Sequence, residues 1–367
     1  GGYNGLELND NCDGTIVEFN ELDSIGKHGI VLRGNNVTVK NNLINHFLLT
    51  VDDGGGIYTF GTYYSGRKII GNIVLNGIGE TSGTDNLGSF QAKGIFLDEP
   101  CANVEVKNNT VAHCSLSGLH GNNVHDILVT DNLFYNCKYQ FYIQHSSTFP
   151  NDPTRNVLLQ NNIFFSKAST QLTLRMYSVS DDISLFGTAD NNFYCRPIDD
   201  NITILSQGGT VRNSLTLPGW QSYSGQDKLS KKAPKTITNE NDLFFEYNAT
   251  NVNKVIPLPA SYVDVKGNLY SNSITLLPYT STILIKSSNT TGNLPPAILN
   301  QNFQLNENSL NGTAVGTLVG TDPNAGQTLS YSIVSGNTNG AFILNATTGL
   351  LTVANTAALN FETTPSF

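Results

Sequence analysis

Two acidic segments of the chain carry carboxylates beside short apolar runs. Asp53 precedes three glycines and a run that contains Tyr58, while Asp98 and Glu99 directly follow the run GIFL. Hydrolysis of a glycosidic bond uses two carboxyl groups, one as acid and the other as base or nucleophile. Asp98 and Asp53 are the predicted pair, with Asp98 as the expected general acid and Glu99 as the alternative to either carboxylate. The competing interpretation is that Asp53 only forms a turn, as Asp commonly does.

Both segments belong to a unit that recurs through the first two hundred residues. Each copy has a short strand, a polar turn, a second short strand and a turn that contains Asn. One copy cannot bury its own apolar residues, so the copies must stack with parallel strands, and their Asn side chains can form a ladder. Clear copies begin at Gly29, Gly56, Gly94 and Gly118, and weaker ones at Phe141 and Leu172. The equivalent asparagines are Asn42, Asn109, Asn132, Asn162 and Asn192.

Alternate residues of each first strand should face the core and the solvent. The predicted inward pairs are Ile30/Leu32, Ile57/Thr59, Ile95/Leu97, Phe141/Ile143 and Leu172/Leu174. The outward residues then form two columns on one surface, because neighbouring coils lie about 4.8 Å apart. The first column is Val31, Tyr58, Phe96, His120, Tyr142 and Thr173. The second is Arg33, Phe60, Asp98, Asn122, Gln144 and Arg175.

Such a surface suits a sugar groove, since aromatic rings pack on sugar faces and polar groups bind hydroxyls. The predicted substrate-binding residues are Tyr58, Phe96, Tyr142, Gln144 and Arg175. His120 is predicted to tune or relay protons beside Asp98. The long segment 61–92 between two copies is expected to form a wall of the groove.

The repeat resembles the pectin-lyase-like family of right-handed parallel β-helices over about residues 1–210. The resemblance implies an all-β solenoid of the carbohydrate-active type that acts on a polysaccharide. A leucine-rich repeat is disfavoured because its strict leucine spacing is absent. An antiparallel sandwich would not repeat one sequence at the length of a coil.

Three functions are compatible with this surface. A glycoside hydrolase that uses the carboxylate pair is the favoured one, and it requires no cofactor. A polysaccharide lyase needs a base and a cation, which Lys93, His120, Tyr142 and Arg175 can supply, although the surface is not strongly basic. A calcium-dependent adhesin or carbohydrate-binding protein without catalysis is the third.

The repeat ends near residue 210. Residues 211–288 contain short strand-like runs separated by turn residues, which predict a small β-sandwich or a cap on the solenoid. A polar, proline-containing linker follows at residues 289–297. The rest, residues 298–367, resembles a truncated cadherin repeat in the pieces NEN, GTLVGTDPNAG, LSYSI, FILNATTGLLTV and LNFE.

The cadherin resemblance implies a calcium site and attachment to a cell surface or matrix. The positions that match family ligands are Glu307, Asp322 and Glu362. Asn324 and Asn360 stand where the family usually has Asp, so weak binding is expected, because calcium prefers carboxylate ligands.

Composition excludes other classes of function. The net charge of −9 and the lack of a Lys/Arg cluster argue against nucleic acid. No apolar run reaches the roughly 20 residues of a membrane span. The sequence from Gly1 already reads as the middle of a domain, so we expect a piece of a longer protein that is secreted or lies at the cell surface.

Overall fold

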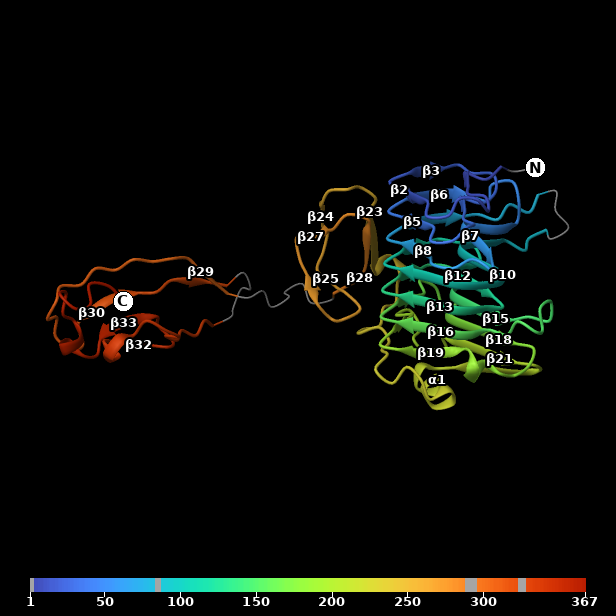
Figure 1. The fold of residues 1–367 in the computed structure, drawn as a ribbon. Helices are drawn as coiled ribbons and strands as arrows, with labels where there is room; N and C mark the ends of the chain where they lie inside the picture. Colours follow the sequence, from blue (N-terminus) through green and yellow to red (C-terminus); the bar gives the residue numbers. More distant parts are fainter. Residues whose placement is uncertain (1–2, 83–86, 288–295, 323–327) are drawn as a thin grey trace. The chain divides into compact units, whose positions relative to one another are not determined.

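The computed structural model describes residues 3–82, 87–287, 296–322 and 328–367. The chain divides into two compact units, residues 1–288 and 289–367. The larger unit begins with a stack of coils whose strands run parallel (Figure 1). The predicted parallel stacking is therefore confirmed.

Each full coil has three faces, named here the first, second and third face. The first face consists of β1 (Leu6–Glu7), β4 (Ile30–Val31), β7 (Asp53–Gly61), β10 (Gln91–Lys107), β12 (Ser117–Asn122), β15 (Tyr139–His145), β18 (Leu172–Ser178) and β21 (Ile204–Gly208). The second consists of β2 (Ile16–Glu18), β5 (Thr38–Lys40), β8 (Arg67–Ile70), the end of β10, β13 (Val124–Thr130), β16 (Arg155–Gln160) and β19 (Gly187–Asp190). The third consists of β3 (Glu21–Asp23), β6 (Leu43–Phe47), β9 (Ile73–Gly77), β11 (Thr110–Ala112), β14 (Leu133–Tyr135), β17 (Ile163–Phe165) and β20 (Phe193–Cys195).

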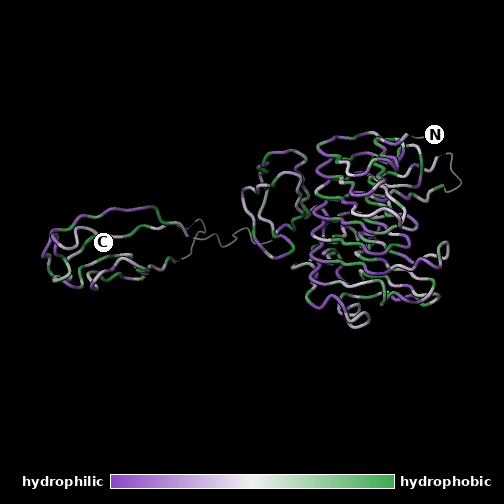
Figure 2. The backbone as a smooth tube through the Cα atoms, in the orientation of Figure 1, coloured by the Kyte–Doolittle hydropathy of each residue, from purple (hydrophilic) through white to green (hydrophobic). Residues whose placement is uncertain are grey.

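The sequence interpretation assigned two strands to each copy and missed the third, which forms the third face. These strands directly follow the recurring Asn turn, and several have only three residues, as in β11, β14 and β17. So short a run carries too little alternation to be distinguished from a turn. Hydrophobic and hydrophilic residues alternate along the coils, as expected when every strand has one buried side (Figure 2).

The predicted asparagine ladder is confirmed at the corner between the second and third faces. Each buried Asn donates Nδ2–H to the Oδ1 of the next coil, over 2.9 Å from Asn42 to Asn72 and 3.0 Å from Asn109 to Asn132. Asn20 and Asn72 extend the ladder beyond the predicted set. The residue before each ladder Asn has a positive φ, such as 53° at Asn41. Asn, Asp and Gly tolerate that conformation best, which explains the recurring NN and DN pairs.

A glycine column lies where the first face begins. A Cβ on Gly94 would lie 2.0 Å from Cγ1 of Val111 and 2.7 Å from the carbonyl oxygen of Gly118, so no side chain fits there. Gly29, Gly56 and Gly118 have equally close neighbours. The close approach lets the next residue of each copy enter the core. The predicted core residues Ile95, Leu97, Leu119 and Phe141 are all buried.

The predicted alignment of β18 was wrong by two residues. Phe141 pairs with Leu174 and Tyr142 pairs with Arg175, so Arg175 belongs to the first column. Thr173, predicted outward, is buried and donates its Oγ1–H to the carbonyl of Thr203 over 3.0 Å. Leu172, predicted in the core, is partly exposed. A shift of two preserves the alternation of a strand, so the sequence pattern cannot detect it.

Residues 211–230 close the end of the solenoid. Strand β22 (Val211–Leu215) pairs antiparallel with β21, and helix α1 (Leu217–Ser224) buries Trp220. The buried carboxylate of Asp227 ends the ladder, because it accepts hydrogen bonds from Asn192 Nδ2 at 3.1 Å and Trp220 Nε1 at 2.8 Å. A short 3₁₀ helix, η1 (Ile183–Leu185), precedes β19.

The rest of the predicted sandwich region forms antiparallel sheets. One has the order β23 (Leu243–Asn248), β28 (Thr280–Lys286), β25 (Tyr262–Val263) and β26 (Leu269–Tyr270), and the other pairs β24 (Lys254–Pro257) with β27 (Ser273–Leu276). The 3₁₀ helix η2 (Glu240–Asp242) precedes them. Phe245 stacks on Tyr135 with ring centroids 4.9 Å apart, so the four-stranded sheet packs against the third face.

The smaller unit contains short antiparallel strands. These are β29 (Ala297–Ile298), β30 (Ala314–Thr317), β31 (Gly320–Thr321), β32 (Phe342–Leu344) and β33 (Leu350–Val353), with 3₁₀ helices η3 (Thr338–Gly340) and η4 (Thr356–Ala358). Its core is small and includes Ala341, Val353 and Leu359. The cadherin resemblance remains a prediction. Among the described residues, no helix has the length and apolar character needed to cross a membrane.

Candidate functional site

Five aromatic rings form a continuous column on the side of the first face that points away from the core. The prediction that this column faces solvent was wrong for Phe96, His120 and Tyr142, which are buried. Stacked pairs stand at its two ends, His28 on Tyr58 and His120 on Tyr142, each with ring centroids 4.2 Å apart. Phe96 joins the pairs, 5.5 Å from Tyr58 and 5.4 Å from His120. Four of these rings were predicted from the sequence, and His28 was not. It lies three residues before Val31, the residue that pairs with Tyr58, so the alignment did not include it.

Asp98 lies in an irregular stretch of β10. Leu97 pairs with Thr59 and Cys101 with Gly61, so β10 uses four steps where β7 uses two. Bulges of this kind redirect side chains and are frequent beside active sites. Here the bulge contains both predicted carboxylates of this segment, Asp98 and Glu99.

Three donors converge on the carboxylate of Asp98. The Tyr58 hydroxyl donates to Oδ2 over 2.8 Å, while Asn122 Nδ2 at 3.1 Å and the Glu99 amide at 2.9 Å donate to Oδ1. Because all three groups donate to it, the carboxylate acts only as a hydrogen-bond acceptor in these contacts. This contact pattern suits a base or nucleophile, whereas the sequence had suggested a general acid.

A chain of hydrogen bonds extends from Asp98 across the following coils. Gln144 Nε2 donates to Asn122 Oδ1 over 2.6 Å, and the Tyr142 hydroxyl donates to Gln144 Oε1 over 2.6 Å. Every donor in the chain points toward Asp98. Asn122 is the link that sequence reasoning placed in the column without giving it a role.

Asp53 is the first residue of β7, the strand that also contains Tyr58. Its side chain is 59% exposed and forms an ion pair with the buried ammonium group of Lys93. Burial raises the pKa of Tyr58, and the negative charges of Asp98 and Asp53 raise it further. The charges of both predicted catalytic carboxylates therefore act on one phenol, and Asp98 contacts it directly. Lys93 Nζ also lies 4.3 Å from the centroid of Phe96.

The two histidines of the ring column are neutral near pH 7. Burial, helped by the charge of Lys27, lowers the pKa of His28 to about 4. Burial and the nearby charges of Lys93 and Arg175 lower the pKa of His120 well below its usual value. Within the described parts of the chain, neither ring nitrogen of His120 has a hydrogen-bond partner.

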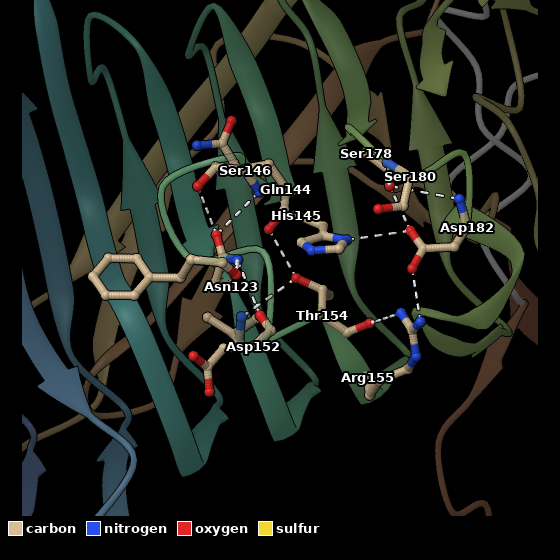
Figure 3. Close-up of polar contacts among 12 residues, drawn as sticks. Asn123, Gln144, His145, Ser146, Asp152, Thr154, Arg155, Ser178, Ser180 and Asp182 are labelled. Carbon is tan, nitrogen blue, oxygen red and sulfur yellow. Dashed lines mark hydrogen bonds and ion pairs between the residues drawn. The ribbon is translucent and has the colours of Figure 1, made fainter. Parts of the chain in front are cut away.

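Glu99 points to the corner after the first face. Its Oε1 accepts a hydrogen bond from Ser146 Oγ over 2.8 Å. Ser146 also contacts buried Asn123, whose Nδ2 donates to the carbonyls of Phe149 at 2.8 Å and Asp152 at 3.0 Å (Figure 3). Glu99 therefore helps to hold the turn after β15.

The contacts of the neighbouring polar network in Figure 3 indicate a structural role. Arg155 Nη2 lies 2.7 Å from Asp182 Oδ2, and His145 Nδ1 lies 3.5 Å from Oδ1 of the same carboxylate. Ser178 donates directly to Asp182 instead of to the histidine. This Ser, His and Asp set therefore lacks the arrangement of a nucleophilic triad, in which the histidine accepts from the serine.

A cleft of about 610 Å³ opens beside the second half of the ring column. His120, Tyr142, Gln144 and Arg175 form its floor, while Lys138 and residues 87–91 also line it. Residues 87–91 thus provide part of the predicted wall, whereas residues 83–86 of that segment lie outside the described residues. Asp98 is connected to the cleft through Gln144 and Asn122.

Arg175 is held at one end of this cleft. Its Nη1 donates to the Tyr139 hydroxyl over 2.9 Å, and its guanidinium carbon lies 4.4 Å from the centroid of Tyr142. Carboxylates are absent from the described residues that line the cleft, so Lys138 and Arg175 are its charged groups there. The surface is more basic than the sequence alignment indicated.

The predicted calcium ligands lie in the smaller unit. Glu307 borders a surface cleft together with Phe303, Phe342 and Phe361. Among the described residues, no three His, Cys, Asp or Glu side chains gather in a group able to hold a metal ion. Calcium binding by Glu307, Asp322 and Glu362 therefore remains a prediction.

Comparisons with known proteins address the fold. No curated protein is significantly similar in sequence. The Dettilon tailspike protein is 12% identical over 95% of this chain and 69% of its own, with a TM-score of 0.36. The A-module of the Azotobacter vinelandii mannuronan C-5 epimerase is 12% identical over 60% of this chain and 57% of its own, with a TM-score of 0.27. Residues 1–183 match the family described as "Right handed beta helix region", and this part of the chain is a right-handed parallel β-helix.

Proposed function

We propose that the first face of the solenoid cleaves glycosidic bonds in a polysaccharide, with Asp98 and Asp53 as the two carboxylates. The observation that carries the proposal is the position of Tyr58, which hydrogen-bonds Asp98 and is near enough to Asp53 for both charges to raise its pKa. Two carboxylates on an outward face lined with rings meet the basic requirement of glycoside hydrolysis.

The contacts of each carboxylate suggest its role. Asp98 accepts from three donors and is fixed in position, which suits the base or nucleophile. Asp53 is the more exposed carboxylate, so it is the one that can exchange a proton with substrate and solvent. His120 and Tyr142, which are 5% and 8% exposed, line the cleft in which sugar units would bind.

A polysaccharide lyase is the second candidate, and the cleft beside His120 favours it. A lyase needs a cation near the substrate's carboxylate and a base for the adjacent proton. Arg175 and Lys138 line the cleft, and His120, which also lines it, is neutral, as a base must be. Both of its ring nitrogens are buried and have no hydrogen-bond partner among the described residues. In this mechanism Asp98 would orient the hydrogen-bond chain instead of attacking the sugar.

A panel of soluble polysaccharides distinguishes the two reactions. A hydrolase produces new reducing ends without unsaturated sugars, whereas a lyase produces both. For the hydrolase, Asp98→Asn should lower turnover at least about a hundredfold, because the amide can neither attack nor accept a proton. Glu105→Gln is the matched control. Glu105 is also a carboxylate of β10, but it lies in the end of the strand that belongs to the second face. Normal turnover in Asp98→Asn would contradict the assignment.

A further inference from the structure

A second cleft continues the first one around a corner of the solenoid. It has a volume of about 570 Å³ and is lined by residues at the ends of third-face strands and in the turns that follow them. The two clefts share Phe90, Ser115 and Lys138. Phe90 is 49% exposed, so the common edge presents an aromatic ring to solvent. The cleft beside Tyr142 and Arg175 therefore adjoins the second cleft at this edge.

The second cleft differs from the first in chemistry. Its floor is a network of uncharged polar groups, in which Asn136 Nδ2 lies 2.7 Å from His113 Nδ1 and Gln171 Nε2 donates to Asn136 Oδ1 over 2.7 Å. Burial, followed by the charge of Lys167, lowers the pKa of His113 and keeps its ring neutral. Lys138, at the shared edge, is the charged group among the described lining residues.

Neutral amide, imidazole and hydroxyl groups beside an exposed ring are the groups that bind sugar hydroxyls and sugar faces. An anion or a metal ion would need charged partners in the cleft. Among the described lining residues, the charged group is Lys138, at the shared edge. A protein surface would need a more continuous apolar patch than the one that Phe90 and Ile78 provide here. The contents of the cleft thus select an uncharged part of a glycan.

We infer that a bound polysaccharide turns the corner between the first and third faces, with additional sugar units held in the second cleft. This inference rests on the proposed function, because it extends the same bound chain away from the carboxylates. Its consequence is a preference for long chains, since a short oligosaccharide bound in the first cleft gains no contacts in the second. Residues of the second cleft then contribute to the binding of polymer and leave the reacting bond untouched.

The test blocks the second cleft from its exposed side. Thr170 lines that cleft, is exposed, and does not line the first one. Thr170→Trp should lower the ratio of polymer affinity to trisaccharide affinity about tenfold, a loss of about 1.4 kcal/mol. Binding is measured by calorimetry in the Asp98→Asn background, with the polymer that the wild type cleaves and its purified trisaccharide. Thr210→Trp, in an exposed turn at the end of the solenoid, is the matched control.

The outcomes separate the two proposals. An unchanged ratio in Thr170→Trp, or equal affinities of the unblocked protein for polymer and trisaccharide, would overturn the second cleft alone. Absence of cleavage of every polymer would contradict the proposed function and this inference with it. A tenfold fall that appears in Thr170→Trp and not in Thr210→Trp would support a chain that turns the corner.

Discussion

The hydroxyl group of Tyr58 donates a hydrogen bond to Asp98 Oδ2 over 2.8 Å, and the two residues come from strands of neighbouring coils. Stacking on His28 fixes the plane of the tyrosine ring, so the donor is held before any substrate arrives. Preorganised donors of this kind are worth most where charge develops during a reaction.

Tyr58→Phe removes this donor and keeps the ring. We expect turnover to fall roughly tenfold, because one of the three hydrogen bonds to Asp98 is lost. The thermal midpoint should change little, since the ring column is preserved. Kinetics on a cleaved polysaccharide, with Phe60→Leu in the same face as control, check this. Full activity of Tyr58→Phe would show that the phenol does not support Asp98.

The asparagine ladder should be a major source of stability. Asn132 accepts from the amide and the Nδ2 of Asn109, and its own Nδ2 donates to Asn162, so truncation leaves several buried groups without partners. Asn132→Ala should lower the free energy of unfolding by about 3 kcal/mol. Asn20→Ala removes an exposed rung at the end of the ladder and should cost less than about 1 kcal/mol. Urea unfolding of both variants tests the difference, and equal losses would contradict it.

Stability should also depend on the ionisation of Asp200. Burial raises the pKa of this carboxyl from 3.8 to about 6, although Lys232 opposes the shift. The charged form is therefore less favourable in the folded chain than in the unfolded chain. Because the folded pKa is the higher one, this group's contribution to stability is present below about pH 4 and is lost as the pH rises through about 6.

Asp200→Asn removes that dependence. We expect the variant to gain stability relative to the wild type as the pH rises from about 4 to about 7. Asp131→Asn, at a more exposed carboxylate paired with Lys107, should show no such trend. Denaturant midpoints across this pH range provide the measurement. A constant difference between Asp200→Asn and the wild type would indicate that burial does not perturb this carboxyl.

Calcium should stabilise the smaller unit if Glu307, Asp322 and Glu362 are ligands. Addition of calcium should raise the melting temperature of this unit in a protein extended beyond Phe367, because a ligand that binds only the folded state stabilises it. The gain should be small, as Asn360 lacks the charge of a carboxylate. Removal of calcium with a chelator should reverse the shift, and Glu307→Gln should reduce it. No shift at saturating calcium would end the prediction.

Local rules in the sequence account for the coil. Glycine is required where Gly94 meets Val111 and Gly118, and Asn or Asp is favoured before each ladder position, so both recur visibly in the sequence. The alternating apolar residues then identify the inward side of each first strand. For these reasons the parallel stack, the ladder, and the grouping of Tyr58, Phe96, His120 and Tyr142 with Asp98 were predictable.

The tertiary structure decided the register and the cleft. Alternation has a period of two, so only the hydrogen bonds between β15 and β18 placed Arg175 beside Tyr142. The burial of Thr173 depends on a contact with another part of the chain, because its hydroxyl donates to the carbonyl of Thr203. The bulge at Asp98 and the connection through Asn122 to Gln144 depend on contacts between residues of different coils, which no local pattern records. The continuation of the cleft past Lys138 likewise exists only because two faces of the solenoid meet there. Side chains distant in sequence share that corner through the stacking of whole coils, so its shape follows from packing and not from the type of any single residue.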